Sequence, residues 1–297
     1  MIRNRLDKNF KIDKFRVDGK LKHSLNQFPT VVEPLYDSDE TFHGLMNKRQ
    51  SIMADRQDLL YADGRYGLLV IFQGMDAAGK DGAVKHVMSG LNPQGAQVTS
   101  FGVPSKEDLK HDFLWRSHQA LAPRGNFTIF NRSYYEEALT VRIHKESLAS
   151  ENLPLEILND SDLWKTRFKD IRHYEEYLTN QGYKILKFFL HISKSEQKIR
   201  LLSRLDEPDK NWKLSMSDVK ERNFWKKYEN VYDEAISATA TPDAPWFIIP
   251  ADDKKNARLI ISRIIADELE AMKLSHPTSN PAKKLELKKI KKELAKS

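Results

Sequence analysis

The sequence of 297 residues contains no cysteine, and this absence excludes disulfide bonds, thiolate catalysis and cysteine-ligated zinc. No apolar run approaches the roughly 18 residues that a membrane-spanning helix needs, and the first residues lack the apolar centre of a signal peptide. The nine histidines are scattered without a metal-binding or triad pattern, so a hydrolytic metal centre is not expected. We therefore expect a cytoplasmic protein that does not bind membranes.

Positive charge is in excess, because 49 lysine and arginine residues face 42 aspartate and glutamate residues. Residues 1–28 and residues 276–297 each have a net charge of +5, so that of the remaining residues is −3 when the chain total is +7. This distribution predicts no nucleic-acid-binding surface. The basic ends are interpreted as solvated, partly disordered charge, and electrostatic capture of a polyanion is the alternative.

A phosphate-binding loop follows a stretch that is typical of a buried strand. Residues 67–73 read GLLVIFQ and residues 74–82 read GMDAAGKDG, which matches the P-loop pattern G-x-x-x-x-G-K. In a P-loop, backbone N–H groups and the N-terminus of the next helix surround a phosphate, and the lysine neutralises its charge. An apolar helical pattern over residues 84–91 supports the assignment. The expected phosphate contacts are Gly74, Ala77, Ala78, Gly79, Lys80, Asp81 and Gly82.

Two carboxylates distinguish this loop from most P-loops. The Ser or Thr that normally follows the lysine and holds magnesium is Asp81 here, and Asp76 lies inside the loop. An acid among phosphate oxygens is repulsive unless a metal ion bridges them or the acid orients a nucleophile. Both roles are open for Asp76.

Strand-like and helix-like stretches alternate along the chain, which favours an α/β fold with a parallel sheet of five strands and helices on both faces. Ligands of such sheets bind at the carboxyl ends of the strands, where Gly74, Asn131 and Pro250 are expected. The predicted strands are 68–72, 97–101, 127–130, 183–192 and 246–249. The predicted helices are 39–62, 106–119, 162–180, 195–205, 217–238 and 254–272, with a short helix or a frayed tail over 280–297.

Further basic side chains are candidates for phosphate contacts. Arg132 follows a predicted strand, and beside a P-loop its guanidinium can bind a phosphate bidentately. The helix 195–205 has basic residues close to helical spacing, for which an exposed helix face is the alternative. Residues 206–215 combine turn residues with basic groups, as in a mobile lid. The candidates in these two segments are Arg200, Arg204, Lys210 and Lys213.

A helix N-terminus follows this stretch. Ser217 is expected to cap it, and Asp218 is expected to stabilise the helix before it serves any other role.

Together these segments resemble polyphosphate kinase family 2, the polyphosphate:nucleotide phosphotransferases. The resemblance extends over residues 67–253 in ordered blocks. It implies a P-loop kinase core, similar to thymidylate kinase, with a helical lid. The blocks are GMDAAGKDGAVK (74–85), LNPQG (91–95), FGVPS (101–105), NRSYYE (131–136), WKLS (212–215) and WFIIPADD (246–253).

The resemblance implies that inorganic polyphosphate donates a phosphoryl group and that an adenine nucleotide, AMP or ADP, accepts it. It implies that Asp76 orients the acceptor phosphate and helps to hold Mg²⁺, with Mn²⁺ as an alternative cation. Lys80 and Arg132 then hold the transferring group. It further implies that Lys85 and basic lid residues such as Arg204 contact the successive phosphates of the polymer.

Two positions bear on the choice of acceptor. Asn131 stands where several relatives have aspartate, and it brings no negative charge to a metal. Glu136 stands where some relatives have asparagine, a pattern that resembles the subgroup acting on both AMP and ADP. Glu136 lies five residues past Asn131, about one and a half helical turns, and is expected inside the next helix if that helix starts near Ser133. Nucleotide contacts are expected from Asn131, Arg132, Glu136 and Lys213.

The predicted organisation has three parts: a basic N-terminal extension (1–38), a P-loop kinase domain (39–275) with a lid around 204–222, and a basic C-terminal tail (276–297). A homo-oligomer is expected. One alternative function is an ATP-dependent nucleoside monophosphate kinase, which Asp81 disfavours because a hydroxyl normally serves Mg·ATP there. A second is a non-catalytic polyphosphate- or nucleotide-binding regulator, which the intact Asp76, Lys80 and Arg132 disfavour.

Overall fold

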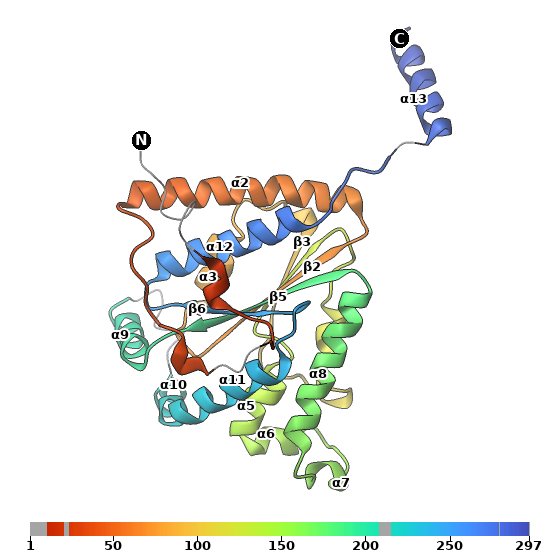
Figure 1. Ribbon diagram of the computed structural model, residues 1–297. Helices are drawn as coiled ribbons and strands as arrows, with labels where there is room; N and C mark the ends of the chain where they lie inside the picture. The colour runs from red at the N-terminus through yellow and green to blue at the C-terminus, as the bar shows by residue number, and fades with distance from the viewer. Residues whose placement is uncertain (1–10, 21–23, 208–214, 279, 297) are drawn as a thin grey trace.

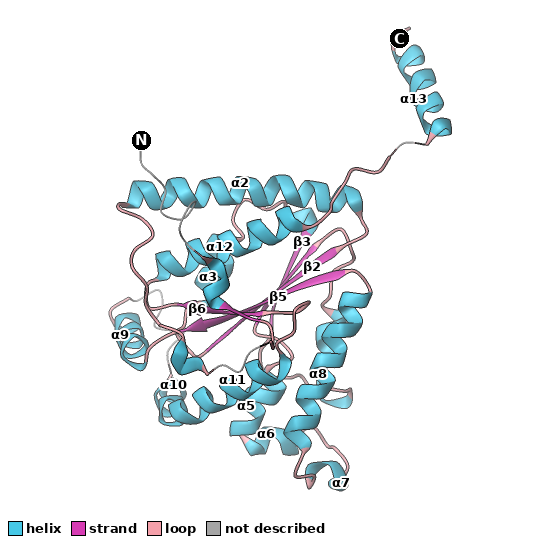
Figure 2. Cartoon of the chain, in the orientation of Figure 1, coloured by secondary structure: helices cyan, strands magenta, loops and turns pink. Residues whose placement is uncertain are grey.

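A mostly parallel sheet forms the centre of the molecule (Figure 1, Figure 2). The computed structural model describes residues 11–20, 24–207, 215–278 and 280–296. Within these ranges the sheet has the strand order β1-β6-β5-β2-β4-β3. The strands are β1 (Arg16–Val17), β2 (Gly67–Gly74), β3 (Ala96–Ser100), β4 (Phe127–Asn131), β5 (Tyr183–His191) and β6 (Trp246–Pro250).

The five predicted strands are confirmed, and β2 lies at the centre between β4 and β5 in parallel pairing. Every residue of β2 is buried, which explains its continuous apolar sequence. The sheet also has a sixth strand that was not predicted, since β1 pairs with β6 in the antiparallel direction. A strand of two residues is too short to show an alternating pattern in the sequence.

Helices cover both faces of the sheet. The first group, α2, α3 and α12, packs together on one face, and α5, α8 and α11 pack on the other (Figure 1). The helices are α2 (Asp39–Asp63), α3 (Lys80–Val87), α4 (Trp115–Gln119), α5 (Glu136–Ile143), α6 (Lys145–Ala149), α7 (Leu155–Leu158), α8 (Leu163–Asn180), α9 (Lys194–Leu205), α10 (Met216–Glu221), α11 (Trp225–Thr239), α12 (Lys254–Ala271) and α13 (Pro281–Leu294). Short 3-10 turns are η1 (Ile12–Phe15), η2 (Leu25–Gln27), η3 (Pro93–Gly95), η4 (Asp108–Lys110) and η6 (Arg222–Phe224).

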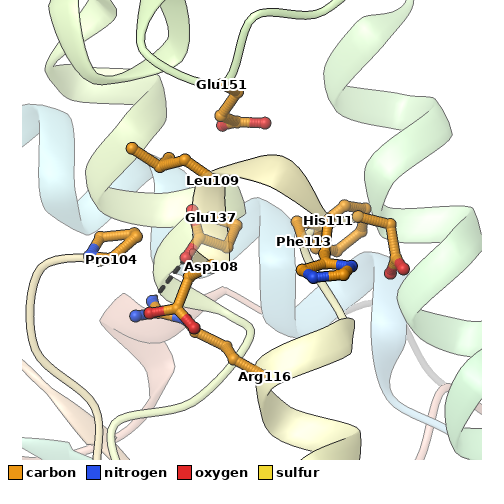
Figure 3. A pocket seen from close by; sticks show the side chains of 9 residues that line it. Pro104, Asp108, Leu109, His111, Phe113, Arg116, Glu137 and Glu151 are labelled. Carbon is orange, nitrogen blue, oxygen red and sulfur yellow. Dashed lines mark hydrogen bonds and ion pairs between the residues drawn. The ribbon is translucent and has the colours of Figure 1, made fainter. Parts of the chain in front are cut away.

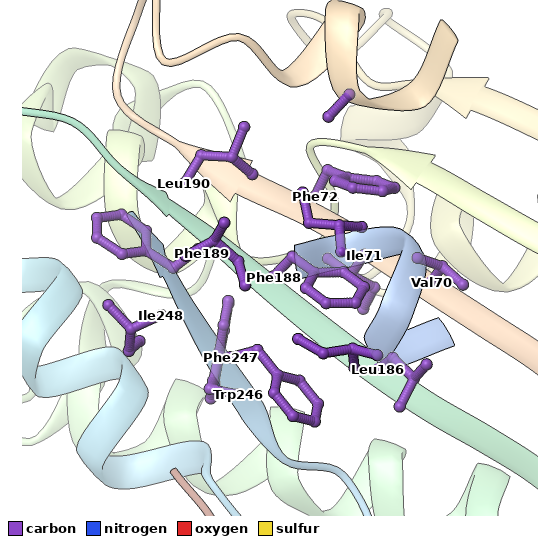
Figure 4. Packing of buried hydrophobic residues seen from close by; sticks show 14 of the residues in the cluster. Val70, Ile71, Phe72, Leu186, Phe188, Phe189, Leu190, Trp246, Phe247 and Ile248 are labelled. Atoms are coloured by element: carbon purple, nitrogen blue, oxygen red, sulfur yellow. The ribbon is translucent and has the colours of Figure 1, made fainter. Parts of the chain in front are cut away.

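A row of phenylalanine rings crosses the sheet close to the carboxyl ends of three strands (Figure 4). Phe72, Phe188 and Phe247 occupy one register on β2, β5 and β6. Their ring centroids lie 5.4 Å and 5.6 Å apart, and all three side chains are buried. Truncating one such ring costs about 3–5 kcal/mol of folding free energy. The row therefore contributes to the stability of the three strands β2, β5 and β6.

The N-terminal extension packs on the core through its apolar residues, so the expectation of partial disorder is wrong for the described part, whose lysines are exposed as expected. Phe15 and Leu25 are buried in the hydrophobic core. The amide of Leu25 donates to Asp233 Oδ1 at 2.7 Å, and the amide of Leu35 donates to Asn256 Oδ1 at 2.9 Å. These contacts fasten the extension to α11 and to the first turn of α12.

Two predicted helices are shorter or more broken than expected. The helix 106–119 is replaced by η4 and α4. Asp108 accepts a hydrogen bond from the amide of Ser105, and Asp112 accepts one from Leu114. Such local bonds compete with a continuous helix. The helix 217–238 divides into α10, η6 and α11.

The cap of α10 is Ser215 rather than Ser217. Ser215 and Asp218 form a capping box, in which the amide of Ser215 donates to Asp218 Oδ2 at 2.8 Å. Asp218 therefore stabilises the helix, as expected. The basic tail forms the exposed helix α13, which stands apart from the sheet (Figure 1). In the described ranges, no helix has the length and apolar character that crossing a membrane requires.

Candidate active site

The P-loop (residues 74–79) joins β2 to α3, as its sequence predicts. Lys80 is the first residue of α3, and Gly79 precedes it with a φ of 103°. This backbone conformation strains any residue with a Cβ atom, which explains the glycine. Because the first N–H groups of a helix have no partners within it, the start of α3 offers donors to an anion.

The ammonium group of Lys80 lies inside the loop. The residue is only 8% exposed, and its Nζ donates to the carbonyl oxygens of Gly74 at 2.6 Å and Met75 at 3.2 Å. Burial, and secondly the nearby guanidinium of Arg132, lower the pKa of Lys80 to about 8. A phosphate bound here would restore the charged form, since opposite charge favours it.

Arg132 lies opposite Asp76 at the carboxyl edge of the sheet. It follows β4 with a φ of 62°, and its amide donates to the carbonyl of Phe72 at 2.9 Å. One guanidinium nitrogen lies 3.2 Å from Asp76 Oδ1, and another lies 3.7 Å from Glu136 Oε2. Glu136, then Asp76, raises the pKa of Arg132. The group therefore stays charged beside the P-loop.

Glu136 contacts Arg132, and its position in the following helix differs from the predicted one. It is the first residue of α5, so the expectation that this helix starts near Ser133 is wrong. Its carboxylate accepts from Gln73 Nε2 at 3.0 Å and from Thr140 Oγ1 at 2.6 Å. The buried Gln73, which sequence reasoning missed, thus links the end of β2 to the start of α5.

Asn131 and Asp81 contact each other across the sheet edge. Asn131 Nδ2 donates to Asp81 Oδ1 at 2.9 Å. Asn131 Oδ1 is buried and has no hydrogen-bond partner among the described residues.

An open cleft of about 850 Å³ contains the P-loop. Basic side chains outnumber acidic ones along its walls, as an anionic ligand requires. Most of the predicted site residues line this cleft. Gly74 and Glu136 are described by the structure but do not line it. Lys210 and Lys213 lie outside the described residues. The predicted residues in the cleft are Asp76, Ala77, Ala78, Gly79, Lys80, Asp81, Gly82, Lys85, Asn131, Arg132, Arg200 and Arg204.

Two basic residues of the cleft were missed by sequence reasoning. Lys254 and Arg258 lie one turn apart on α12, which begins shortly after the carboxyl end of β6. A Cβ atom on Gly82 would lie 3.3 Å from a guanidinium nitrogen of Arg258. Burial, and then the neighbouring Arg200, lower the pKa of Arg258. The position of α12 after a parallel strand was the signal available in the sequence.

A second cavity, at the loop before α4, is too small for a substrate (Figure 3). Its volume of about 20 Å³ suits one water molecule. In it Arg116 donates to Glu137 Oε1 at 2.6 Å. Burial raises the pKa of Glu137, against the effect of that arginine.

The cleft has oxygen ligands that suit a hard divalent cation. They are the carboxylate of Asp76 and the amide oxygen of Asn131. Among the described residues, no group of three or more histidine and acidic side chains gathers to hold a metal ion. Mg²⁺ is commonly bound by one or two protein oxygens together with phosphates and water. The residues present therefore fit a cation that arrives with its phosphate ligands.

Comparisons with known proteins agree with this geometry. The family model Polyphosphate kinase 2 (PPK2) matches residues 36–277. An ADP-polyphosphate phosphotransferase of Rhodopseudomonas palustris is 48% identical over 96% of this chain and 99% of its own length. An AMP/ADP-polyphosphate phosphotransferase of Meiothermus ruber is 42% identical over 76% and 80%. The crystal structure of polyphosphate kinase 2 from Arthrobacter aurescens has a TM-score of 0.80 and 35% identity, with 90% and 91% of the two chains covered. With a P-loop, an arginine facing it and a basic cleft around both, the chain belongs to the polyphosphate kinase 2 family.

Proposed function

We propose that the protein transfers the terminal phosphoryl group of inorganic polyphosphate to ADP and to AMP, with Mg²⁺ as the metal ion. The observation that supports this most is the cleft itself, in which the P-loop lies between basic residues of α3, α9 and α12. The names of the R. palustris and M. ruber relatives include the same donor and these acceptors. Asp81, at the position where a hydroxyl residue usually serves Mg·ATP, disfavours ATP as the donor.

The reaction needs no side-chain nucleophile. An oxygen of the terminal phosphate of the nucleotide forms a bond to the last phosphorus of the polymer. The bond from that phosphorus to the bridging oxygen breaks, and the polymer leaves one unit shorter. Such transfers depend on positioning and charge neutralisation. A divalent cation supplies additional positive charge to the phosphate oxygens.

The residues of the cleft have two roles, at the transferring phosphate and along the rest of the polymer. Lys80 and Arg132 neutralise the transferring group, and Asp76 orients Arg132 and offers an oxygen to the cation. Away from the P-loop, basic residues follow the remaining phosphates of the polymer. These residues are Lys85, Arg204, Lys254 and Arg258.

The test is to incubate the protein with Mg²⁺ and either AMP or ADP, and to supply polyphosphate or ATP as the donor. We expect ATP from ADP plus polyphosphate, and ADP followed by ATP from AMP plus polyphosphate. Product formed from AMP with ATP as the sole donor, and none with polyphosphate, would support the monophosphate kinase instead. Binding of polyphosphate without any product would support the non-catalytic regulator. Removal of Mg²⁺ with a chelator should stop the transfer, and added Mn²⁺ should restore part of it.

A further inference from the structure

The guanidinium group of Arg200, on α9, donates hydrogen bonds only to oxygen atoms of the protein among the described residues. The residue is 5% exposed, although its side chain reaches the wall of the cleft. An arginine side chain has five N–H donors, and five acceptors surround this one. They are Glu196 Oε1 at 2.8 Å from Nε, the carbonyls of Ala77 at 3.1 Å and Ala78 at 2.9 Å from Nη1, and the carbonyls of Ala251 at 2.5 Å and Asp252 at 2.9 Å from Nη2.

These bonds join two neighbouring loops of the cleft. Ala77 and Ala78 belong to the P-loop, and Ala251 and Asp252 belong to the connection between β6 and α12. That connection leads directly to Lys254 and Arg258. Arg200 therefore adds a direct side-chain link between the P-loop and the start of α12, beside the packing of α3 on α12.

Gln197, one turn earlier on α9, adds a third bond to the P-loop. Its Nε2 donates to the carbonyl of Asp76 at 2.9 Å, and its Oε1 accepts from Arg222 at 2.6 Å. Three consecutive carbonyls of the P-loop, those of residues 76–78, are thus bound by α9. In a trans peptide the N–H points opposite to the carbonyl. The N–H groups of Ala77 and Gly79 are consequently turned away from α9.

We propose that Arg200 is a positioning residue of the phosphate site and not a ligand of polyphosphate. With five acceptors around five donors, the described structure leaves it without a spare N–H for a phosphate. Its role is to orient the P-loop peptides and to hold α12 at the distance that the polymer needs. Gln197 assists in the first of these tasks. The proposal rests on the phosphoryl transfer proposed above.

The test is the variant Arg200→Lys, which keeps the positive charge. A lysine ammonium is a compact group with three donors, so it cannot bind four carbonyls on two loops. We expect kcat to fall about 100-fold, the loss typical of a misplaced catalytic group. Amide hydrogen exchange should accelerate in residues 76–79 and 251–253 of the full-length protein. A variant that keeps more than about a third of wild-type kcat would overturn the proposal.

Equilibrium binding of polyphosphate at several salt concentrations separates positioning from direct contact. Loss of a phosphate-binding side chain lowers the salt slope by about one, as we expect for the matched variant Lys85→Met. For Arg200→Gln we expect a slope within about 0.3 of the wild type, and a reduction near one would identify Arg200 as a ligand. Because binding and hydrogen exchange need no turnover, these results stand apart from the test of the proposed reaction.

Gln197→Met provides a second variant in case the arginine variants do not fold. It removes the bond to the Asp76 carbonyl, and also the bond from Arg222, without changing the charge of residue 197. We expect kcat to fall about tenfold, the effect of losing the neutral hydrogen bond to the P-loop, with an unchanged salt slope. Wild-type kcat in this variant would show that pinning the P-loop carbonyls is unnecessary, and would contradict the proposal.

Discussion

Charged residues at the P-loop make hydrogen bonds and ion pairs with neighbouring groups of the protein, and bound phosphate would replace these contacts or add to them. Lys80 donates to two carbonyls of its own loop, and Arg132 contacts Asp76. We expect Lys80→Ala and Asp76→Asn each to reduce the rate by two to three orders of magnitude, because loss of one preorganised charge costs about 3–4 kcal/mol. The measurement is kcat/KM with polyphosphate and ADP, alongside thermal unfolding. Either variant with more than about a third of wild-type turnover would remove that residue from the mechanism.

The lowered pKa of Lys80 predicts a pH dependence. With a pKa of about 8 in place of 10.5, the free enzyme loses the ammonium charge as the pH rises through 8. We expect kcat/KM to decline above that pH, and kcat to decline at a higher pH because bound phosphate favours the proton. Between pH 8 and 10.5 the unfolded chain binds the proton that the folded chain has lost, so this group makes stability rise with pH. A pH profile of Lys80→Arg without the decline would support the assignment, and an unchanged profile would contradict it.

Glu136 offers a test of acceptor choice. Its carboxylate contacts Gln73, Thr140 and Arg132. If it tunes the acceptor, Glu136→Asn should reduce AMP phosphorylation much more than ADP phosphorylation. If it only supports Arg132 and the start of α5, both activities should fall together. Initial rates with the two acceptors at saturating polyphosphate decide between these outcomes, and equal losses would contradict acceptor tuning.

At the scale of elements, a buried polar network holds the segment between β4 and α5. Lys187 on β5 and Glu175 on α8 form an ion pair at 2.6 Å, and both are inaccessible to solvent. Glu175 Oε1 also accepts from the hydroxyls of Tyr134 at 2.9 Å and Tyr135 at 2.8 Å. Those tyrosines directly follow Arg132 and Ser133, so the network fixes the chain on which Arg132 stands.

Removal of one partner from this network should be costly. Glu175→Gln leaves the ammonium of Lys187 buried without its counter-charge, and we expect a loss of about 3–5 kcal/mol of unfolding free energy. The double variant Glu175→Leu with Lys187→Met should be less destabilised than Glu175→Gln, because apolar pairs replace buried ion pairs at low cost. Urea unfolding of the three proteins measures this. A double variant that is as destabilised as Glu175→Gln, or more so, would contradict this expectation.

Strongly periodic elements could be predicted from the sequence, and elements set by tertiary contacts could not. The apolar run of β2 predicted a buried strand, and the glycine spacing predicted the P-loop. The same motif predicted Asp76 and Lys80 as site residues. Gln73 and Gln197 carry no local signal, because each acts through a partner far along the chain. Arg200 was found by its spacing, but sequence spacing could not show that its donors meet carbonyls from two distant loops.

At the scale of the whole molecule, charge should govern the capture of the polymer. The cleft is basic, and the exposed α13 adds lysines at a distance from it (Figure 1). We expect polyphosphate affinity to fall steeply with salt, by analogy with counterion release from nucleic acids. Deleting residues 280–297 should slow association and leave kcat at saturation unchanged. Stopped-flow binding and steady-state rates measure the two effects. A flat response to salt would argue against a track of basic residues.

The pairing of β1 with β6 has a consequence for the order in which the chain is made. Val17 leaves the ribosome early, yet its partner on β6 is Trp246. Until β6 is synthesised, β5 also presents an unpaired edge, since it pairs with β6 from Lys187 to His191. An unpaired edge beside exposed aromatic residues promotes aggregation. Translation that stops before β6 should therefore release an insoluble fragment and not a smaller folded domain.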